Sequence, residues 1–357
     1  MFCRKSKGLG LLVLVAALVV ITGVAGCTSE KQTVRVLCAG SLMVPFQEME
    51  REFEKLHPDV DVLIEGHGSI QVIRHVTELY EKADVMVVAD YSLLPMMMYN
   101  TTMPGTTEAY ADWHLKFATN NLGLAYTPES RYASEINSEN WHEILSRPEV
   151  KLGLSDPRLD SCGYRSLMVC QLAELYYDDQ EIFENLITSN FETPVTASEN
   201  DGSHVISVPE VLEPNTGRIA LRGSSVRLLF LLDSGDVDYA FQYQSVAEQH
   251  GLQYLELPSE INLGSRESEY ANRYENVTVK LDFQRFKSIT PEFTGQPIVY
   301  GMTIPKNAPH PEIAIQFIKF VTGTQGQLVL STNKQPAIIP PETDDFSKIP
   351  EAIKPML

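Results

Sequence analysis

The chain has 357 residues, a formal net charge of −19 at pH 7, and 43% hydrophobic residues. This length exceeds one ordinary hydrophobic core and predicts two domains. The strong negative charge excludes nucleic acids and anionic membrane surfaces as partners, because both are bound through basic surfaces. After Cys27 only Cys38, Cys162 and Cys170 remain, an odd and sparse set that argues against a disulfide framework, and the absence of a C-x-x-C pair argues against a zinc site.

Residues 1–26 are typical of an export signal, in which Arg4, Lys5 and Lys7 precede the apolar run LGLLVLVAALVVITGVAG. The alternative is an uncleaved transmembrane anchor, since the run is near the lower length limit for spanning a membrane. The order VAGC resembles a lipobox, in which Cys27 becomes the lipidated first residue of the mature protein. Cleavage removes three basic residues and no acidic one, so the mature net charge is −22. We expect a protein exported to the extracellular face of the cell membrane and lipid-anchored there.

After the signal, β-branched and apolar segments alternate with helical periodicity, which is typical of an α/β protein with mainly parallel sheets. We expect the first three strands at 33–40, 60–66 and 84–90. Between them, apolar residues from Phe46 to Leu56, spaced three and four apart, predict a helix that ends before Pro58. A second helix is expected over 69–82.

Two extended segments, 120–129 and 297–306, lie far apart in the chain. They predict two hinge strands that join a lobe made of both chain ends to a central second lobe. The expected boundaries are 33–117 plus 299–357 for lobe 1 and 118–298 for lobe 2. Between and after these segments, we expect a helix around 141–145 and another over 310–323.

Three strand-to-helix turns share one design, although they are distant in sequence. They are Gly40-Ser41, Gly68-Ser69 and Asp160-Ser161-Cys162-Gly163. In each turn glycine permits a close approach, and a serine can cap the helix while its hydroxyl and the first free N–H groups point outward. Such helix ends bind oxyanions without any basic residue. One such serine is usually only a cap, but three in one exported chain indicate a dehydrated tetrahedral anion held between two lobes.

Four stretches carry a resemblance to a known family. They are VLCAGSLMVPFQEMEREFEKLHPDVDVLIEGHGSIQVIRHVTELYEKADVMVVADYSLLP, DSCGYRS, LLDSGDVDYAFQYQSVAEQHGL and GQPIVYGMTIPKNAPHPEIAIQFIKFVTG. Over nearly the whole mature chain, the sequence resembles the archaeal tungstate/molybdate-binding proteins of ABC importers (ModA/WtpA family). The resemblance implies a type II periplasmic-binding-protein fold, in which two α/β lobes close on an oxyanion and deliver it to a membrane permease. It implies no enzyme activity and no cofactor, and we expect a monomer.

The resemblance also implies which residues contact the oxyanion: Gly40, Ser41, Ser69, Asp160, Ser161, Cys162, Ser225 and Tyr243. Cys162 would contribute its backbone N–H. Asp160 would bind the central tungsten or molybdenum, because these atoms accept additional oxygen ligands whereas sulfur and phosphorus do not. A carboxylate there favours tungstate or molybdate and repels sulfate and phosphate.

The sequence departs from the family at one position. The family uses an Asp and a Glu as the two additional ligands, and Ser225 stands where the Glu is expected. Either Asp160 coordinates alone or with a water molecule, or the site is four-coordinate and Ser225 donates a hydrogen bond. The loss of one negative charge also relaxes discrimination against sulfate.

Three other functions are compatible with parts of this pattern. A receptor for sulfate, phosphate or another tetrahedral oxyanion would keep the three turns and give Asp160 no ligand role. An anion-sensing subunit would bind the same ligand without transporting it. An exported hydrolase with Ser41 or Cys162 as nucleophile is disfavoured, because neither residue lies beside a recognisable base or within a G-x-S-x-G motif.

Overall fold

The computed structural model describes residues 31–200, 202–282 and 291–357. Residues 31–357 form one compact unit. The predicted signal sequence and Cys27 lie outside the described residues. Within the described ranges, no helix combines the length and the apolar character needed to cross a membrane.

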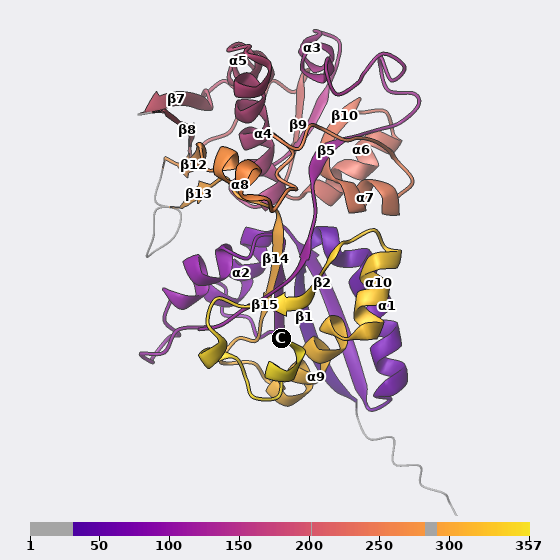
Figure 1. The fold of residues 1–357 in the computed structure, drawn as a ribbon, viewed down its shortest axis with the longest axis vertical. Coiled ribbons are helices and arrows are strands. Elements are labelled where there is room, and N and C mark those ends of the chain that lie inside the picture. The colour runs from indigo at the N-terminus through magenta and orange to yellow at the C-terminus, as the bar shows by residue number, and fades with distance from the viewer. Residues whose placement is uncertain (1–30, 201, 283–290) are drawn as a thin grey trace, which may run out of the picture. The chain divides into compact units, whose positions relative to one another are not determined.

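The first sheet has six strands in the order β15-β4-β14-β3-β1-β2 (Figure 1). Strand β1 runs parallel to β2 and β3, whereas β14 runs antiparallel to β3 and β4, and β15 runs antiparallel to β4. Both ends of the described chain contribute strands: β1 Gln32–Ala39, β2 Val60–His67, β3 Val85–Val88, β4 Leu115–Thr119, β14 Val299–Thr303 and β15 Ala337–Glu342.

Two further sheets come from the middle of the chain. The five-stranded sheet has the order β11-β5-β10-β6-β9, and the four-stranded sheet has the order β13-β12-β8-β7. The five strands are β5 Leu122–Tyr126, β6 Leu152–Ser155, β9 Ile219–Arg222, β10 Tyr239–Tyr243 and β11 Gln253–Leu255. The four are β7 Thr196–Asn200, β8 Ser203–Val208, β12 Val277–Leu281 and β13 Glu292–Thr294.

The expectation of mainly parallel sheets is wrong, because each of the three sheets is mixed. β4 belongs to the first sheet and β5 to the second, and the chain runs directly from one to the other through Asn120 and Asn121. The two passages between the first and second sheets touch, since Asn120 N donates to Ile298 O over 3.3 Å. The lobe boundaries at 117 and 298 stay a prediction.

The helices cover the faces of these sheets (Figure 1). They are α1 Met43–Leu56, α2 Ser69–Thr77, α3 Trp141–Ser146, α4 Ser161–Tyr177, α5 Ile182–Leu186, α6 Leu229–Asp233, α7 Gln244–Gln249, α8 Ser268–Tyr274, α9 Pro311–Thr322 and α10 Thr324–Thr332. Short 3₁₀ turns, η1 Gly40–Leu42 and η4 Ser225–Leu228, precede α1 and α6. Helix α2 ends at Thr77 rather than at Lys82, and Tyr80 beyond it takes a left-handed φ of 58°.

Aromatic packing holds α1 against the first sheet and α9. Phe53 meets Phe317 edge to face with ring centroids 5.3 Å apart, and Phe46 meets Phe317 at 6.2 Å. Full burial of each such ring contributes roughly 2–3 kcal/mol. Leu56 was expected on the same buried stripe but is 56% exposed, because it occupies the last position of the helix. This packing fixes the start of α1, and with it η1, at the carboxyl end of β1.

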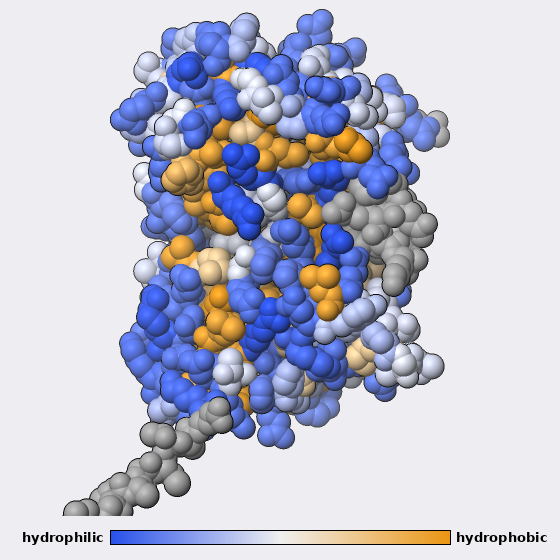
Figure 2. All heavy atoms as spheres, turned by 180° about the vertical axis from the view of Figure 1, so that it is seen from behind, coloured by the Kyte–Doolittle hydropathy of each residue, from blue (hydrophilic) through white to orange (hydrophobic). Residues whose placement is uncertain are grey.

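The face seen in Figure 2 is mostly hydrophilic, with apolar patches between the polar side chains. Among the described residues, Phe230 and Leu328 are large hydrophobic side chains that are exposed to solvent. The abundance of polar surface agrees with the acidic composition of the chain.

Candidate functional site

The predicted turns lie at the carboxyl ends of strands. η1 follows β1, α2 follows β2 after Gly68, α4 follows β6 after a short loop, and η4 follows β9. The expected serine caps are wrong: Ser69 and Ser161 are the first helical residues, and the N-cap positions are Gly68 and Asp160. Because the serine hydroxyls make no capping bond, they are available for contacts across the site.

The turns of the first and second sheets pack directly on each other. A Cβ added to Gly68 would lie 3.0 Å from the Cβ of Asp160, and one added to Gly40 would lie 2.9 Å from Cγ2 of Val226. Both approaches therefore require glycine. The N–H groups of Ile70 and Gln71, in the first turn of α2, donate to Leu159 O over 3.2 and 3.3 Å. The sequence pattern predicts that the first N–H groups of the helix are free. In the structure these two amides are instead hydrogen-bonded across the contact.

Asp160 is the charged group at the centre of this contact. Its side chain is buried, with the residue 5% exposed, and Oδ2 accepts the backbone N–H of Ser225 over 2.8 Å. Burial raises the pKa of Asp160, and the hydrogen bond from the backbone N–H of Ser225 partly offsets that rise, with smaller contributions from the Ser155 hydroxyl and the nearby backbone N–H groups of Ser69 and Cys162. The carboxylate therefore lies where the N-termini of α2 and α4 and the first N–H of η4 converge.

A cluster of buried hydroxyl groups begins at Ser161, the residue next to Asp160. Ser161 Oγ donates to Ser69 Oγ over 3.2 Å and lies 3.3 Å from the hydroxyl of Tyr243. Ser69 Oγ also accepts the N–H of Ala89 over 3.0 Å. The structure therefore brings Ser69, Ser161 and Tyr243 together from α2, α4 and β10.

Gly40 and Ser41 reach the same region from η1. Ser41 Oγ is hydrogen-bonded to the hydroxyl of Tyr300 over 3.0 Å. The ring of Tyr300 in turn lies 6.1 Å from the ring of Tyr243, centroid to centroid. With the contact of Gly40 on Val226, beside Ser225, all eight predicted residues belong to one buried region.

Arg165 is the residue that the sequence interpretation missed. Its guanidinium is buried, and Nη1 donates to the hydroxyl of Tyr243 over 2.9 Å and to Ala89 O over 2.8 Å. A buried cation therefore lies directly behind a site that was expected to contain no basic residue. The signal was present in DSCGYRS, because Arg165 is four residues after Ser161 and faces the same side of α4.

Cys162 does not behave as a nucleophile. Burial raises the pKa of its thiol to about 12, so the thiol stays protonated at neutral pH. Its Sγ lies 3.6 Å from Phe241 O as a donor. This environment removes the chemical basis for Cys162 as a catalytic residue.

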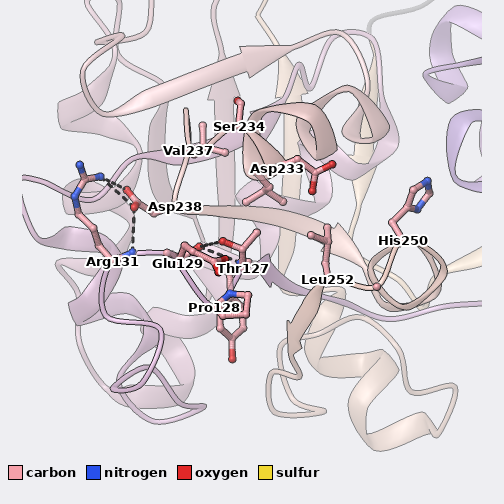
Figure 3. Close-up of a pocket in the computed structure, with 15 residues that line it drawn as sticks. Thr127, Pro128, Glu129, Arg131, Asp233, Ser234, Val237, Asp238, His250 and Leu252 are labelled. Atoms are coloured by element: carbon pink, nitrogen blue, oxygen red, sulfur yellow. Dashed lines mark hydrogen bonds and ion pairs between the residues drawn. The ribbon is translucent and has the colours of Figure 1, made fainter.

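A separate pocket of about 650 Å³ lies in the second sheet region (Figure 3). The loop after β5, the ends of α6 and α7 and the start of β10 line it, and none of the eight predicted residues takes part. Tyr126, which lines it, pairs with Tyr239 at the opposite end of β10 from Tyr243. The pocket is therefore distinct from the buried polar cluster.

Comparisons with known proteins agree on the family. The sequence profile of the bacterial extracellular solute-binding proteins matches residues 34–333. An uncharacterized solute-binding protein of Methanoculleus marisnigri is 39% identical over 96% of this chain and 96% of its own length. The molybdate/tungstate-binding protein WtpA of Thermococcus kodakarensis is 40% identical over 96% of this chain and 95% of its own length.

Solved structures of low sequence identity share the fold. The periplasmic molybdate-binding protein of Azotobacter vinelandii has a TM-score of 0.52 at 15% identity, over 86% of this chain and 99% of that chain. The sulfate-binding protein SubI of Mycobacterium tuberculosis has a TM-score of 0.53 at 11% identity, over 87% and 88%. The α/β fold is that of the periplasmic binding proteins, as expected. The chain therefore belongs to the extracellular solute-binding protein family, which supplies the ligand-binding component of ABC transporters, and it is not an enzyme.

Proposed function

We propose that this protein captures tungstate or molybdate at the contact between its first and second sheets and delivers the anion to an ABC permease. The observation that carries this proposal is the position of Asp160, a buried carboxylate on which several backbone N–H groups converge. The relatives named as molybdate/tungstate-binding proteins support the choice of anion.

A carboxylate discriminates strongly among tetrahedral dianions. Two like unit charges 4 Å apart repel each other by about 4 kcal/mol at an effective dielectric constant of 20. The repulsion between Asp160 and a sulfate ion is therefore not compensated, because sulfur accepts no further oxygen. Tungsten and molybdenum accept a carboxylate oxygen, and bond formation offsets the repulsion. We therefore assign Asp160 as the ligand to the central metal of the bound oxyanion.

Ser225 determines how far coordination proceeds. Its backbone N–H holds Oδ2 of Asp160, and its own side chain carries no charge. Asp160 then supplies the single protein ligand, and Ser225, Ser69, Ser161, Ser41 and Tyr243 supply hydroxyl donors around the anion. The backbone N–H groups near Gly40 and Cys162 complete the expected contacts.

A receptor for sulfate or phosphate is the second candidate. It is favoured by the hydroxyl-rich cluster, which carries one carboxylate where the family has two. In that function the Asp160 carboxylate would accept a hydrogen bond from the P–O–H group of phosphate, or, as a neutral acid, would donate one to sulfate. A signalling subunit that binds the same anion is a further alternative, which the ligand alone does not distinguish.

The N-terminal sequence supports a proposal about the cellular setting. We propose export through residues 1–26, lipid attachment at Cys27, and a monomer that presents its bound anion to the permease outside the membrane. Mass spectrometry of the protein recovered from membranes tests the anchor: cleavage before Cys27 and a covalently attached lipid mass on that residue are expected, and an unmodified or uncleaved N-terminus contradicts them.

Equilibrium dialysis against tungstate, molybdate, sulfate and phosphate, with metal and anion analysis, tests the proposed ligand. We expect one bound tungstate or molybdate per chain, retained in excess sulfate. Retention of sulfate or phosphate in preference to both metal oxyanions would establish the second candidate instead.

A further inference from the structure

Two amino acids outside the predicted contact set donate hydrogen bonds to tyrosine hydroxyls beside the site. We propose that Arg165 and Asn120 are positioning residues: by donating to Tyr243 and Tyr300, they direct the hydroxyl protons of Tyr243 and Ser41 toward the bound anion. The inference rests on the proposed function, because it concerns how the same site receives an oxyanion.

Arg165 determines the hydrogen-bonding role of Tyr243. Arginine has no acceptor, so in the 2.9 Å contact the oxygen of Tyr243 must accept from Nη1. Burial raises the pKa of Tyr243 well above its usual range, so the phenol keeps its proton. That proton must point away from Arg165. It is then directed to Ser161 Oγ, 3.3 Å away, or to an anion beside it.

The guanidinium itself is held in place from the first sheet. Nη1 donates to Ala89 O over 2.8 Å, and Nη2 lies 3.2 Å from Oδ2 of Asp90. Tyr164 donates to the same carboxylate oxygen over 2.6 Å, and Gln296 donates to Oδ1 over 3.2 Å. Arg165 therefore has little freedom to withdraw its hydrogen bond from Tyr243.

Asn120 plays the equivalent part for Ser41. Its Oδ1 accepts backbone N–H groups from Asn121 over 3.1 Å and from Ser245 over 3.4 Å. The amide nitrogen therefore faces the other way, where it donates to Ser245 Oγ over 2.8 Å and to the hydroxyl of Tyr300 over 3.1 Å, with Gln335 Oε1 a third acceptor at 3.3 Å. Because the oxygen of Tyr300 accepts there, its proton is directed to Ser41 Oγ, 3.0 Å away. The proton of Ser41 then has no partner within this chain of bonds and is available to an anion.

The two arrangements have the same consequence. Hydroxyl groups can donate or accept, and an anion needs only donors. Setting their direction before the ligand arrives lowers the reorganisation needed on binding. A structural role alone would stabilise the fold without this directional effect, so the two can be separated by experiment.

Replacing Asn120 by Asp tests whether Asn120 sets the direction of the hydrogen bond between Tyr300 and Ser41. The carboxylate turns a donor into an acceptor, so Tyr300 donates to it and the proton of Ser41 is drawn to Tyr300. We expect the affinity for molybdate, measured by calorimetric titration, to fall about 30-fold, the range for a hydrogen bond to a charged group. In the Asn120→Asp background, Tyr300→Phe should restore about tenfold of that loss, because it removes the intermediary.

Gln335→Glu is the control for buried charge. Gln335 contacts Asn120 and Ser245 in the same buried network, but no hydrogen bond to Tyr300 is present among the described contacts. We expect it to weaken binding several-fold less than Asn120→Asp. Equal losses of molybdate affinity in the two variants, or no recovery with Tyr300→Phe, would overturn the positioning role of Asn120.

A double-mutant cycle tests whether Arg165 acts on the anion through Tyr243. It does not depend on the folding of Asn120→Asp. Lysine keeps a positive charge beside Asp90, but a single ammonium does not reproduce the fork of hydrogen bonds to Tyr243 and Ala89. We expect Arg165→Lys to weaken molybdate binding about tenfold, and to do so much less when Tyr243 is already Phe. Equal effects in both backgrounds would assign Arg165 a purely structural role. Asp238→Asn, which removes the buried carboxylate bound by Arg131 (Figure 3), is the matched control and should leave affinity unchanged.

Titration of the unaltered protein with all four anions distinguishes a failure of the proposed function from a failure of the positioning roles of Arg165 and Asn120. If it binds sulfate or phosphate but neither metal oxyanion, the proposed function fails, and the variants are then compared with the anion that binds. The same pattern of losses and recovery would support the positioning roles there too. Absence of binding to any tetrahedral oxyanion would contradict both.

Discussion

The backbone N–H of Ser225 donates to Oδ2 of Asp160 over 2.8 Å, which joins η4 to the N-cap of α4. Ser225 is the residue that the family resemblance aligns with a second carboxylate, and its side chain carries no charge. The two positions of that expected pair therefore meet in the structure, but only Asp160 carries a charge. In the proposed function, Asp160 alone supplies the negative charge and the metal ligand that an Asp and a Glu supply together in the family.

Removal of the carboxylate in Asp160→Ala should separate metal oxyanions from sulfate. We expect tungstate affinity to fall at least about 30-fold because a coordinating oxygen is lost, whereas sulfate affinity should rise because a like charge is removed. Competitive titration measures both changes. Asp156→Asn is the control, since Asp156 is a buried carboxylate of the same loop that pairs with Arg158. Parallel losses for tungstate and sulfate would indicate general damage to the site.

Introduction of the second carboxylate in Ser225→Glu should sharpen selectivity. The expected result is a preference for tungstate over sulfate that increases about tenfold or more, because a second negative charge repels sulfate without compensation. The ratio of the two dissociation constants is the quantity to measure. Ser225→Gln has nearly the same size without the charge and controls for crowding at this buried position. An equal change of the ratio in both variants would contradict the role of charge.

The pH dependence of binding should follow Asp160. Burial raises its pKa above the ordinary aspartate value of about 3.9, and the unliganded fold therefore holds the proton at a higher pH than the unfolded chain does. Coordination needs the ionised carboxylate, so tungstate affinity should be constant above the raised pKa and fall as the pH drops through it, by up to about tenfold per pH unit.

Calorimetric titrations across this pH range, in two buffers of different ionisation enthalpy, measure that effect. Near the raised pKa, binding should release a proton. Asp160→Asn should remove both the proton release and the pH dependence. An affinity that rises on acidification would favour binding to the neutral acid, as for a phosphate or sulfate receptor.

The sequence predicts the ends of strands and helices well where local signals agree. α1 ends just before Pro58, α9 begins at Pro311 and ends before Gly323, and the glycine-serine turns lie at strand ends. It predicts strand direction poorly, because the pairing of β4 and β14 depends on a direct passage between sheets rather than on a local pattern. The end of α2 was also misplaced, since no Pro or Gly lies between Thr77 and Lys82.

The candidate site was predictable in its residues but not in its connections. Ser69 and Asp160 lie in recognisable turns, and Arg165 follows Ser161 by four residues, but the hydrogen bond of Arg165 to Ala89 O depends on the packing of α4 against the end of β3. Asn120 and Tyr300 meet across 180 residues of chain, and no local spacing indicates that contact. Long-range hydrogen bonds of this kind require the fold.

Burial of neutral His114 should account for part of the loss of folding stability at acid pH. Burial lowers its pKa to about 4, whereas an unfolded histidine titrates near about 6.5. Between these values the unfolded chain binds a proton that the native state does not, so the free energy of unfolding should fall as the pH drops from about 6.5 to about 4, by at most about 3 kcal/mol. Below that range the contribution is constant.

Urea denaturation at several pH values measures this slope, and His114→Gln should flatten it. Tyr99 contacts Nδ1 of His114 over 2.8 Å, so the variant should also lose some stability at neutral pH. An unchanged slope in the variant would assign the acid sensitivity to other groups.

X-ray absorption at the tungsten edge of the tungstate-loaded protein tests the central claim most directly. Coordination by Asp160 predicts at least one oxygen beyond the four of free tungstate, and its loss in Asp160→Asn. Four equivalent oxygens in the unaltered protein, unchanged by Asp160→Asn, would contradict the assignment of Asp160 as a metal ligand.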